Sequence, residues 1–172
     1  MGMSDCWCSP PEVATPLVDL FGGPVGMDPC SNERSIIQAF VALTHGGLVL
    51  PWCTDGVPRT AYENFPYSQG QVWTDKALHE LATGNVAELV RLSMMATSSQ
   101  WWADACLKAE RNPRILGLKR LKFISPAPES RRAGGARRMT CRFEPALMYF
   151  GPRPEVFTKT FAHLTRWSTW GR

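Results

Sequence analysis

The sequence predicts a three-layer α/β domain whose central sheet is mixed and mostly parallel. Segments with strand character alternate with segments of helical periodicity, a pattern typical of parallel strands joined by helices. Two apolar strands follow one another late in the chain, which adds an antiparallel final strand. Because 172 residues with 44% hydrophobic content supply one core, we expect residues 1–172 to form a single domain.

The first half of the chain is predicted to begin with a helix. Ser9 is a candidate cap and Pro10 suits the first helical position, whereas Pro16 is expected to kink or shorten the helix. Three extended segments and a second helix are expected to follow. They are a strand at 24–28, a helix carrying Ile36, Ile37, Phe40 and Val41, and short extended segments at 48–52 and 59–63.

The second half is predicted to continue the alternation and to end in a helix. Thr74 or Asp75 is a candidate cap for a helix that runs through Leu81 and ends near Gly84. The remaining expected elements are a buried strand at 86–95, a helix bearing Trp101 and Trp102, strands at 118–124 and 141–150, and a helix at 158–164.

Composition excludes several classes of protein. The chain has no apolar run of membrane-spanning length and no signal-peptide pattern at its start, so we expect no membrane partner and a cytoplasmic location. Six cysteines are scattered through a chain that is apolar enough to fold without disulfides, so reduced thiols are expected. Cys6 and Cys8 have no second pair to complete a zinc site, and we predict no metal.

Basic residues are concentrated late in the sequence, although the net charge is only +4. A loop at about 126–139 is rich in Gly and Arg, and a basic run precedes it. The candidate phosphate-binding residues are Lys119, Arg120, Arg131, Arg132, Arg137 and Arg138. A polyanionic partner and a solvated loop are both compatible with this cluster.

The most informative residues are Asn64, Phe65, Pro66 and Tyr67, which directly follow a predicted strand. Ligands in open α/β sheets bind at the carboxyl ends of strands. The side-chain oxygen of Asn64 and the carbonyl of Phe65 are acceptors suited to the two hydrogens of an exocyclic amine. Tyr67 offers a flat face on which an extruded base can stack.

This tetrapeptide resembles the Asp/Asn/Ser-Pro-Pro-Tyr/Phe motif of amino-group methyltransferases. Nearly the whole chain resembles the phage-encoded DNA N6-adenine methyltransferase (Dam-like) family, and the matching pieces occur in the same order and spacing. These pieces are residues 7–12, 27–32, 47–48, 51–52, 64–68, 101–102, 118–123 and 145–151. The resemblance implies a Rossmann-like methyltransferase fold, S-adenosylmethionine as cofactor, DNA as substrate and, for a phage, protection from host restriction.

By the same resemblance, the acidic turn after the first strand holds the cofactor. Asp28, Pro29, Cys30 and Ser31 are the implied cofactor-binding residues, with Asp28 facing the methionine ammonium group. The sequence departs from the family in two ways: Gly46 replaces an acidic residue before Gly-Leu, and the cofactor turn is not glycine-rich.

Other roles and other functions remain open. Trp101 is a candidate DNA contact. Asp55 and Glu63 lie near the tetrapeptide and could relay a proton, but solvent or turn roles are favoured for both. Methylation of cytosine N4, RNA adenine or protein glutamine would suit a similar tetrapeptide. A DNA-binding protein that keeps the fold without activity, and a structural protein in which Asn64 and Tyr67 are ordinary turn residues, are the alternatives from other classes.

Overall fold

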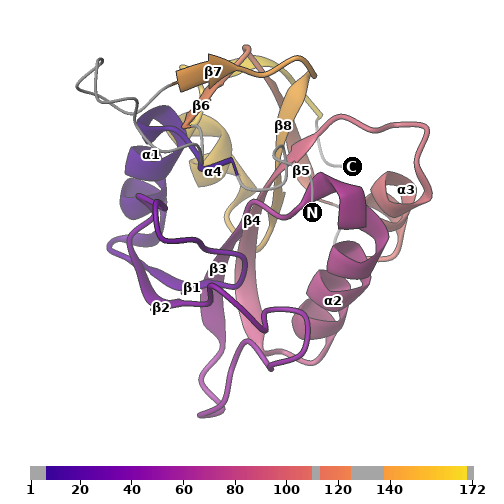
Figure 1. The fold of residues 1–172 in the computed structure, drawn as a ribbon. Coiled ribbons are helices and arrows are strands. Elements are labelled where there is room, and N and C mark those ends of the chain that lie inside the picture. Colours follow the sequence, from indigo (N-terminus) through magenta and orange to yellow (C-terminus); the bar gives the residue numbers. More distant parts are fainter. Residues whose placement is uncertain (1–6, 110–112, 125–137, 170–172) are drawn as a thin grey trace.

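Helices and strands alternate along the computed structural model, which describes residues 7–109, 113–124 and 138–169 (Figure 1). The described helices are α1 (Pro11–Phe21), η2 (Tyr67–Gln69, a 3-10 turn), α2 (Gly70–Ala82), α3 (Gln100–Leu107) and α4 (Pro154–Thr160). The first strands are β1 (Val25–Asp28), β2 (Ala39–Ala42), β3 (Arg59–Glu63) and β4 (Val86–Met94). The later strands are β5 (Arg114–Leu118), β6 (Lys122–Ile124), β7 (Arg138–Thr140), β8 (Pro145–Phe150) and β9 (Thr165–Ser168).

Seven of these strands form one sheet in the order β2-β1-β3-β4-β8-β5-β9. The first four are parallel to one another, and β8 lies antiparallel between β4 and β5. Strand β5 therefore points the same way as β4, which confirms a mostly parallel α/β sheet with a late antiparallel strand. Strand β9, which the sequence did not predict, adds a second antiparallel strand at the edge beside β5.

Helices cover both faces of this sheet, and the alternation of side chains explains why. Along β8, Leu147 and Tyr149 point into one hydrophobic cluster, and Ala146, Met148 and Phe150 point into another. The first cluster contains residues of α1 and α4, and the second contains residues of α2 and α3. A strand that is buried on both faces reads as a continuous apolar run, as the PALMYF sequence of β8 does. The result is three layers (Figure 1).

The predicted helix around residues 36–41 is wrong. Residues 39–42 instead form β2, which pairs in parallel with β1 through Val25 and Ala39. The spacing of apolar residues suggested a buried helical face, but Phe40 is 74% exposed and Ile36 is also exposed. Pairing with β1 satisfies the backbone at this sheet edge, and this long-range contact outweighs the local periodicity.

Two predicted strands also differ from the structure. Residues 48–52 form a turn in which the Gly46 carbonyl accepts hydrogen bonds from the amides of Val49 and Leu50. The predicted strand at 118–124 is two strands: β5 ends at Leu118, and β6 pairs with β7 in a separate two-stranded sheet. The basic segment therefore connects β6 with β7, and not the last two strands of the main sheet.

Several helix boundaries shift by a few residues. Helix α1 begins at Pro11 and continues through Pro16, and α2 begins at Gly70 rather than near Thr74. Ser9 makes no capping hydrogen bond, because its hydroxyl pairs with that of Tyr62 at 2.6 Å. No helix in the described part of the chain is both long and apolar enough to cross a membrane.

Candidate functional site

A narrow polar cavity of about 20 Å³ lies where β1 and β3 end. Because these neighbouring strands are parallel, their carboxyl ends meet at one edge of the sheet. The cavity is lined by Trp7, Cys8, Ser9, Asp28, Cys30, Ser31, Asn32, Ser35, Ile37, Tyr62 and Asn64. In the conformation described, this space admits about one water molecule.

Asp28 is the acidic group of this cavity and is only 3% exposed. Its carboxylate accepts hydrogen bonds from the Cys30 amide at 3.2 Å and the Ser35 hydroxyl at 3.5 Å. Burial raises the pKa of Asp28 to about 6, although these hydrogen bonds oppose the shift. A nearly buried carboxylate in a polar cavity is suited to a cationic ligand group.

Cys30 connects the turn after β1 with the tetrapeptide after β3. Its sulfur accepts a hydrogen bond from the backbone amide of Asn64 at 3.2 Å. Burial raises the pKa of the Cys30 thiol well above its usual value, so the thiol is neutral. Asp28 and Asn64, which are far apart in the sequence, therefore line one cavity.

The side chain of Asn64 has a defined orientation. Its Nδ2 donates to the backbone carbonyl of Trp7 at 2.9 Å, and its Oδ1 accepts from the Tyr67 hydroxyl at 3.2 Å. The Trp7 carbonyl can only accept a hydrogen bond, so it selects the amide orientation in which the oxygen points to the side of Tyr67. Local sequence patterns gave no sign of this contact, because a backbone carbonyl 57 residues away supplies it.

Aromatic rings surround the rest of the tetrapeptide. Phe65 is buried, and its ring meets the rings of Tyr67 and Trp101 edge-on at centroid distances of 5.4 and 5.6 Å. Tyr67 also meets Phe143 at 5.3 Å, and burial raises the pKa of its hydroxyl. Pro66 precedes η2 and keeps an extended backbone with φ of −60°.

Trp101 lies beside this aromatic group, partly buried, at the start of α3. A Cβ atom at Gly70 would lie 2.6 Å from the indole nitrogen of Trp101, so the glycine permits close packing between α2 and α3. Trp102 is buried in the core. A contact of Trp101 with DNA stays a prediction.

Glu63 was misinterpreted as a solvent or turn residue. It is fully buried and forms an ion pair with Arg91, whose Nε lies 2.8 Å from Glu63 Oε2. Burial raises the pKa of Glu63, and Arg91 opposes this shift. The signal in the sequence was Arg91 itself, an arginine in an otherwise apolar predicted strand. Asp55, by contrast, is exposed and pairs with Arg59 at 2.7 Å.

Two adjacent glycines explain the turn that precedes β3. Gly46 has a φ of +80°, which disfavours the acidic residue expected from the family pattern. A Cβ atom at Gly47 would overlap the carbonyl oxygen of Pro29, and the Gly47 carbonyl accepts a hydrogen bond from the Trp52 indole at 2.8 Å. The Gly47 backbone therefore packs directly against the predicted cofactor turn.

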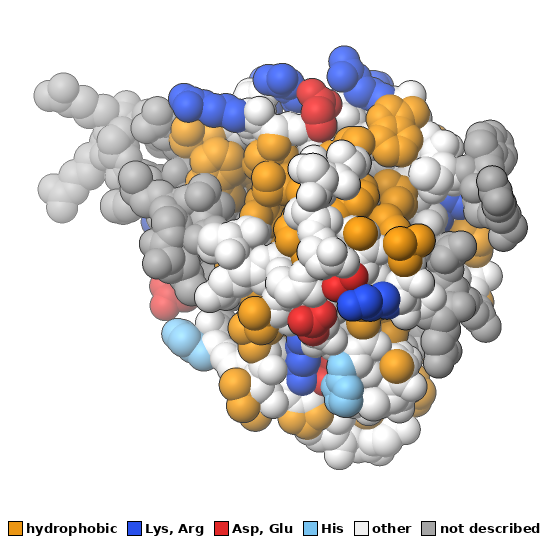
Figure 2. All heavy atoms as spheres, turned by 90° about the vertical axis from the view of Figure 1, so that its right-hand side faces the viewer, with side chains coloured by type: hydrophobic (Ala, Val, Ile, Leu, Met, Phe, Trp, Pro, Cys, Tyr) orange, Lys and Arg blue, Asp and Glu red, His pale blue; other side chains and the backbone are white. Residues whose placement is uncertain are grey.

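Basic side chains gather near the small β6–β7 sheet. Figure 2 shows lysine and arginine side chains along the upper edge of the molecule, around an acidic side chain. Lys119 and Arg120 are exposed, and Arg120 lies 3.7 Å from Glu144. Arg138 lies at the start of β7, 3.7 Å from Glu12. The other predicted DNA contacts, Arg131, Arg132 and Arg137, lie outside the described residues.

The β6–β7 sheet adjoins the candidate site through the N-terminal segment. Cys8 forms a β-bridge with Ile124 of β6, and the Trp7 ring lies 5.8 Å from that of Phe123. Phe123 in turn contacts Phe143, the ring that also meets Tyr67. Continuous contacts therefore connect the basic strands with the tetrapeptide.

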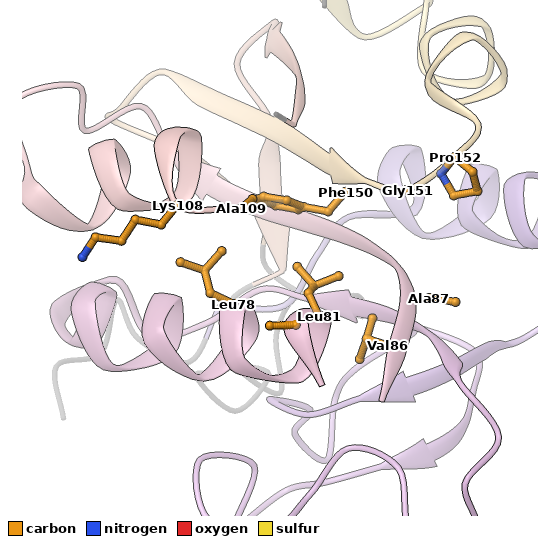
Figure 3. A pocket seen from close by; sticks show the side chains of 10 residues that line it. Leu78, Leu81, Val86, Ala87, Lys108, Ala109, Phe150, Gly151 and Pro152 are labelled. Atoms are coloured by element: carbon orange, nitrogen blue, oxygen red, sulfur yellow. The ribbon is translucent and has the colours of Figure 1, made fainter. Parts of the chain in front are cut away.

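A larger cavity of about 330 Å³ lies at the opposite end of the sheet (Figure 3). Leu78, Leu81, Val86 and Phe150 line it, and Lys108 is its charged residue. It lies near the start of β4 and the end of β8, away from the carboxyl ends of the parallel strands. Apart from Lys108, its lining side chains are apolar, and none carries a carboxylate or amide suited to the recognition of an amine.

Comparison with known protein families supports the resemblance to a methyltransferase family independently of the site geometry. A family model described as "DNA N-6-adenine-methyltransferase (Dam)" matches residues 2–145. The chain belongs to this family. The match includes the Asp28 turn and the whole tetrapeptide, and methyltransferases normally use S-adenosylmethionine. The chain has no significant match among curated protein sequences.

The side chains at the site indicate which cofactor they could hold. The residues at the polar cavity fit S-adenosylmethionine in their chemistry, because a buried carboxylate and several hydroxyl and amide groups surround it. Within the described ranges, no group of three or more His, Cys, Asp or Glu side chains is arranged to hold a metal ion.

Proposed function

We propose that this member of the Dam family transfers a methyl group from S-adenosylmethionine to the N6 amine of adenine in DNA, on a Rossmann-like methyltransferase fold. The observation that supports this most is the fixed orientation of Asn64. Its Nδ2 is held by Trp7, so its Oδ1 is presented beside Tyr67, in the same cavity region as a buried carboxylate.

When bound, the cofactor supplies an electrophilic methyl group. Asp28 would hold its ammonium group, with Cys30 and Ser31 forming the adjoining wall and Pro29 belonging to the same turn. The cavity is narrow because the segment containing Trp7 and Ser9 forms one side of it. We infer that the cavity widens to admit the cofactor, since a space of about 20 Å³ does not hold it.

The tetrapeptide positions the amine for attack. Asn64 Oδ1 and the Phe65 carbonyl would each accept one hydrogen of the N6 amine, leaving the nitrogen lone pair free to form the new bond to the methyl carbon. The proton released from nitrogen passes to solvent. Tyr67 would stack on the extruded adenine, and its hydroxyl would release Asn64 Oδ1 to the incoming amine.

The basic side chains near β6 and β7 would bind phosphates next to this site. Lys119, Arg120 and Arg138 are described there, and three more arginines belong to the intervening segment. Phosphate contacts set the position of a protein on DNA without reading its sequence. We therefore propose that recognition of the target site is short or relaxed.

The proposed reaction is tested by product identification. Unmethylated DNA is incubated with methyl-labelled S-adenosylmethionine and the protein, digested to nucleosides, and analysed by mass. Label in N6-methyladenine, lost in Asn64→Ala and Tyr67→Ala, supports the proposal. Asn85→Ala, at the opposite end of the sheet, is the matched control and retains activity. Label in another nucleoside changes the substrate; DNA and cofactor binding without transfer overturns the proposed activity.

A further inference from the structure

Directly behind the tetrapeptide lies a charged pair that the proposed reaction does not use. Glu63 immediately precedes Asn64, and Arg91 lies opposite Glu63 in the register between β3 and β4. The guanidinium carbon of Arg91 lies 4.7 Å from the centre of the Phe65 ring. We infer that Glu63 and Arg91 are positioning residues that fix Phe65, so that its carbonyl faces the substrate amine; this inference rests on the proposed function.

The energetics of burial argue against stability as the main role of this pair. Glu63 and Arg91 are 0% and 1% exposed, so both charges are removed from water. The desolvation of the two ions costs about as much free energy as their attraction regains. Apolar side chains of similar volume are often neutral or stabilising at such positions. The charged pair supplies a defined geometry, which an apolar pair would lack.

The contacts of Arg91 define that geometry. Besides its ion pair with Glu63, its Nη1 donates to Thr74 Oγ1 at 2.8 Å, and its Nη2 donates to the Trp73 carbonyl at 3.1 Å. Both acceptors belong to α2, the helix that follows the tetrapeptide. The planar guanidinium is therefore held from two sides while it contacts the Phe65 ring.

Phe65 needs such a restraint because its own backbone is not locked. Pro66 restricts Phe65 to extended conformations, but the φ angle of Phe65 is not fixed as it would be by the pyrrolidine ring of a proline. The remaining freedom is removed by packing: Arg91 lies over the ring, and Tyr67 and Trp101 meet it edge-on. A shift of the ring would turn the peptide group whose carbonyl we assign to the amine.

The test replaces both charges at once, because Arg91→Met alone would leave Glu63 buried without its partner. The variant is Glu63→Leu with Arg91→Met, and the matched control is Glu88→Leu with Arg153→Met. The control pair joins β4 to the start of α4 at 3.0 Å, at the opposite end of the sheet. Two readouts are measured: kcat and KM for methyl transfer, and hydrogen exchange of peptides covering residues 62–70 and 145–150.

We expect kcat to fall ~10- to 100-fold in the Glu63/Arg91 variant while KM for the cofactor changes less than ~3-fold, since misplacement of a positioning group acts mainly on the chemical step. Exchange at 62–70 should accelerate at least ~10-fold in this variant and stay at the parent rate in the Glu88/Arg153 control. In a Phe65→Leu background, the same double substitution should cost less than ~3-fold, because the ring through which Arg91 acts is gone.

Parent-like kcat and parent-like exchange at 62–70 would overturn the inference. If the double variant does not fold, Arg91→Lys serves instead, because it keeps a charge for Glu63 but cannot reproduce the planar contacts; a fall in kcat of ~10-fold is then expected. If the parent protein transfers no methyl group, the proposed function fails, and the exchange measurement still decides whether Glu63 and Arg91 order the tetrapeptide.

Discussion

The two ends of the central sheet differ in the kinds of side chain that surround their cavities. At the carboxyl ends of β1 and β3, a cavity of about 20 Å³ is bordered by a buried carboxylate and the oriented amide of Asn64. At the opposite end, a cavity of about 330 Å³ is lined by leucine, valine and phenylalanine side chains. Buried polar groups are costly and need partners, whereas an apolar hollow requires only imperfect packing.

The proposed site is therefore indicated by the polar groups that line a cavity, and not by the volume of the cavity. The narrow end places Asp28, Cys30 and Asn64 at one cavity, where the Asn64 amide donates to the Cys30 sulfur and the Cys30 amide donates to the Asp28 carboxylate. At the wide end the charged lining residue, Lys108, pairs with Asp104, which is not one of the residues that line the cavity. The predictions below test whether function follows this division.

The largest expected effect comes from Asn64→Asp, a change of one atom. The carboxylate would place an acceptor where Nδ2 now donates to the Trp7 carbonyl at 2.9 Å, and two acceptors repel. We expect kcat for methyl transfer to fall ~100-fold, roughly 2.7 kcal/mol in activation free energy. Asn85→Asp at the other end is the control. Unchanged kcat in Asn64→Asp would show that Trp7 does not set the amide orientation.

The next effect concerns the basic segment. Replacing Arg131, Arg132, Arg137 and Arg138 with alanine should weaken DNA binding by ~10-fold or more and lower the slope of log K against log salt by up to ~3 to 4, because each lost phosphate contact contributes ~0.9. Cofactor binding should stay unchanged. DNA titrations at several salt concentrations measure the slope, and a slope equal to that of the parent contradicts the assignment.

Asp28 should make cofactor binding pH-dependent. Its pKa is about 6, and we expect the dissociation constant for S-adenosylmethionine to rise about tenfold for each pH unit below that value, as the carboxylate is neutralised. Calorimetric titrations between about pH 5 and 8 measure this dependence. Asp28→Asn should bind weakly with little dependence on pH. Equal slopes for the two proteins would exclude Asp28 as the ammonium partner.

The Asp28 carboxyl group should affect folding in the sense opposite to its effect on cofactor binding: protonation weakens binding but favours the folded state. Its pKa in the folded chain is about 6, above the ordinary value of 3.8, so the folded state holds the proton more tightly. The charged form is therefore a net cost to folding above pH 6, and this cost disappears as the pH falls from about 6 towards 4. Asp28→Asn should accordingly raise the free energy of unfolding at neutral pH by ~1–3 kcal/mol. A destabilised variant would contradict this expectation.

The smallest effect is expected at the apolar end. Leu78→Phe adds volume beside the 330 Å³ cavity and should leave kcat and KM within ~2-fold of the parent, since no group there contacts substrate. Methyl-transfer kinetics and thermal unfolding on the same preparation separate activity from stability. A fall in kcat beyond ~10-fold, with the melting temperature unchanged, would mean that this end takes part in function.

The sequence suggested where a site could lie, but not its internal contacts. Asp28 ends one predicted strand and Asn64 follows another, and the carboxyl ends of parallel strands lie at one edge of a sheet. The family resemblance then gave the tetrapeptide its expected role. Membership of the family is confirmed by the match over residues 2–145, whereas the roles of individual residues stay predictions.

The remaining contacts depend on register and on distant backbone atoms. Glu63 and Arg91 face each other only because β3 and β4 pair with a register shift near Arg59. The predicted helix at 36–41 failed for a similar reason, since pairing with β1 and not local periodicity determines the conformation of β2. No local pattern encodes such cross-strand relationships.

Photochemical cross-linking tests most directly whether the narrow polar end binds the cofactor. Methyl-labelled S-adenosylmethionine is cross-linked to the protein by ultraviolet light, and labelled tryptic peptides are identified by mass. The account predicts label in the peptides covering 1–34 or 60–76, which contain Asp28 and Asn64, and its loss with excess S-adenosylhomocysteine. Label in the peptide covering 77–91, which lines the apolar cavity, would contradict the account.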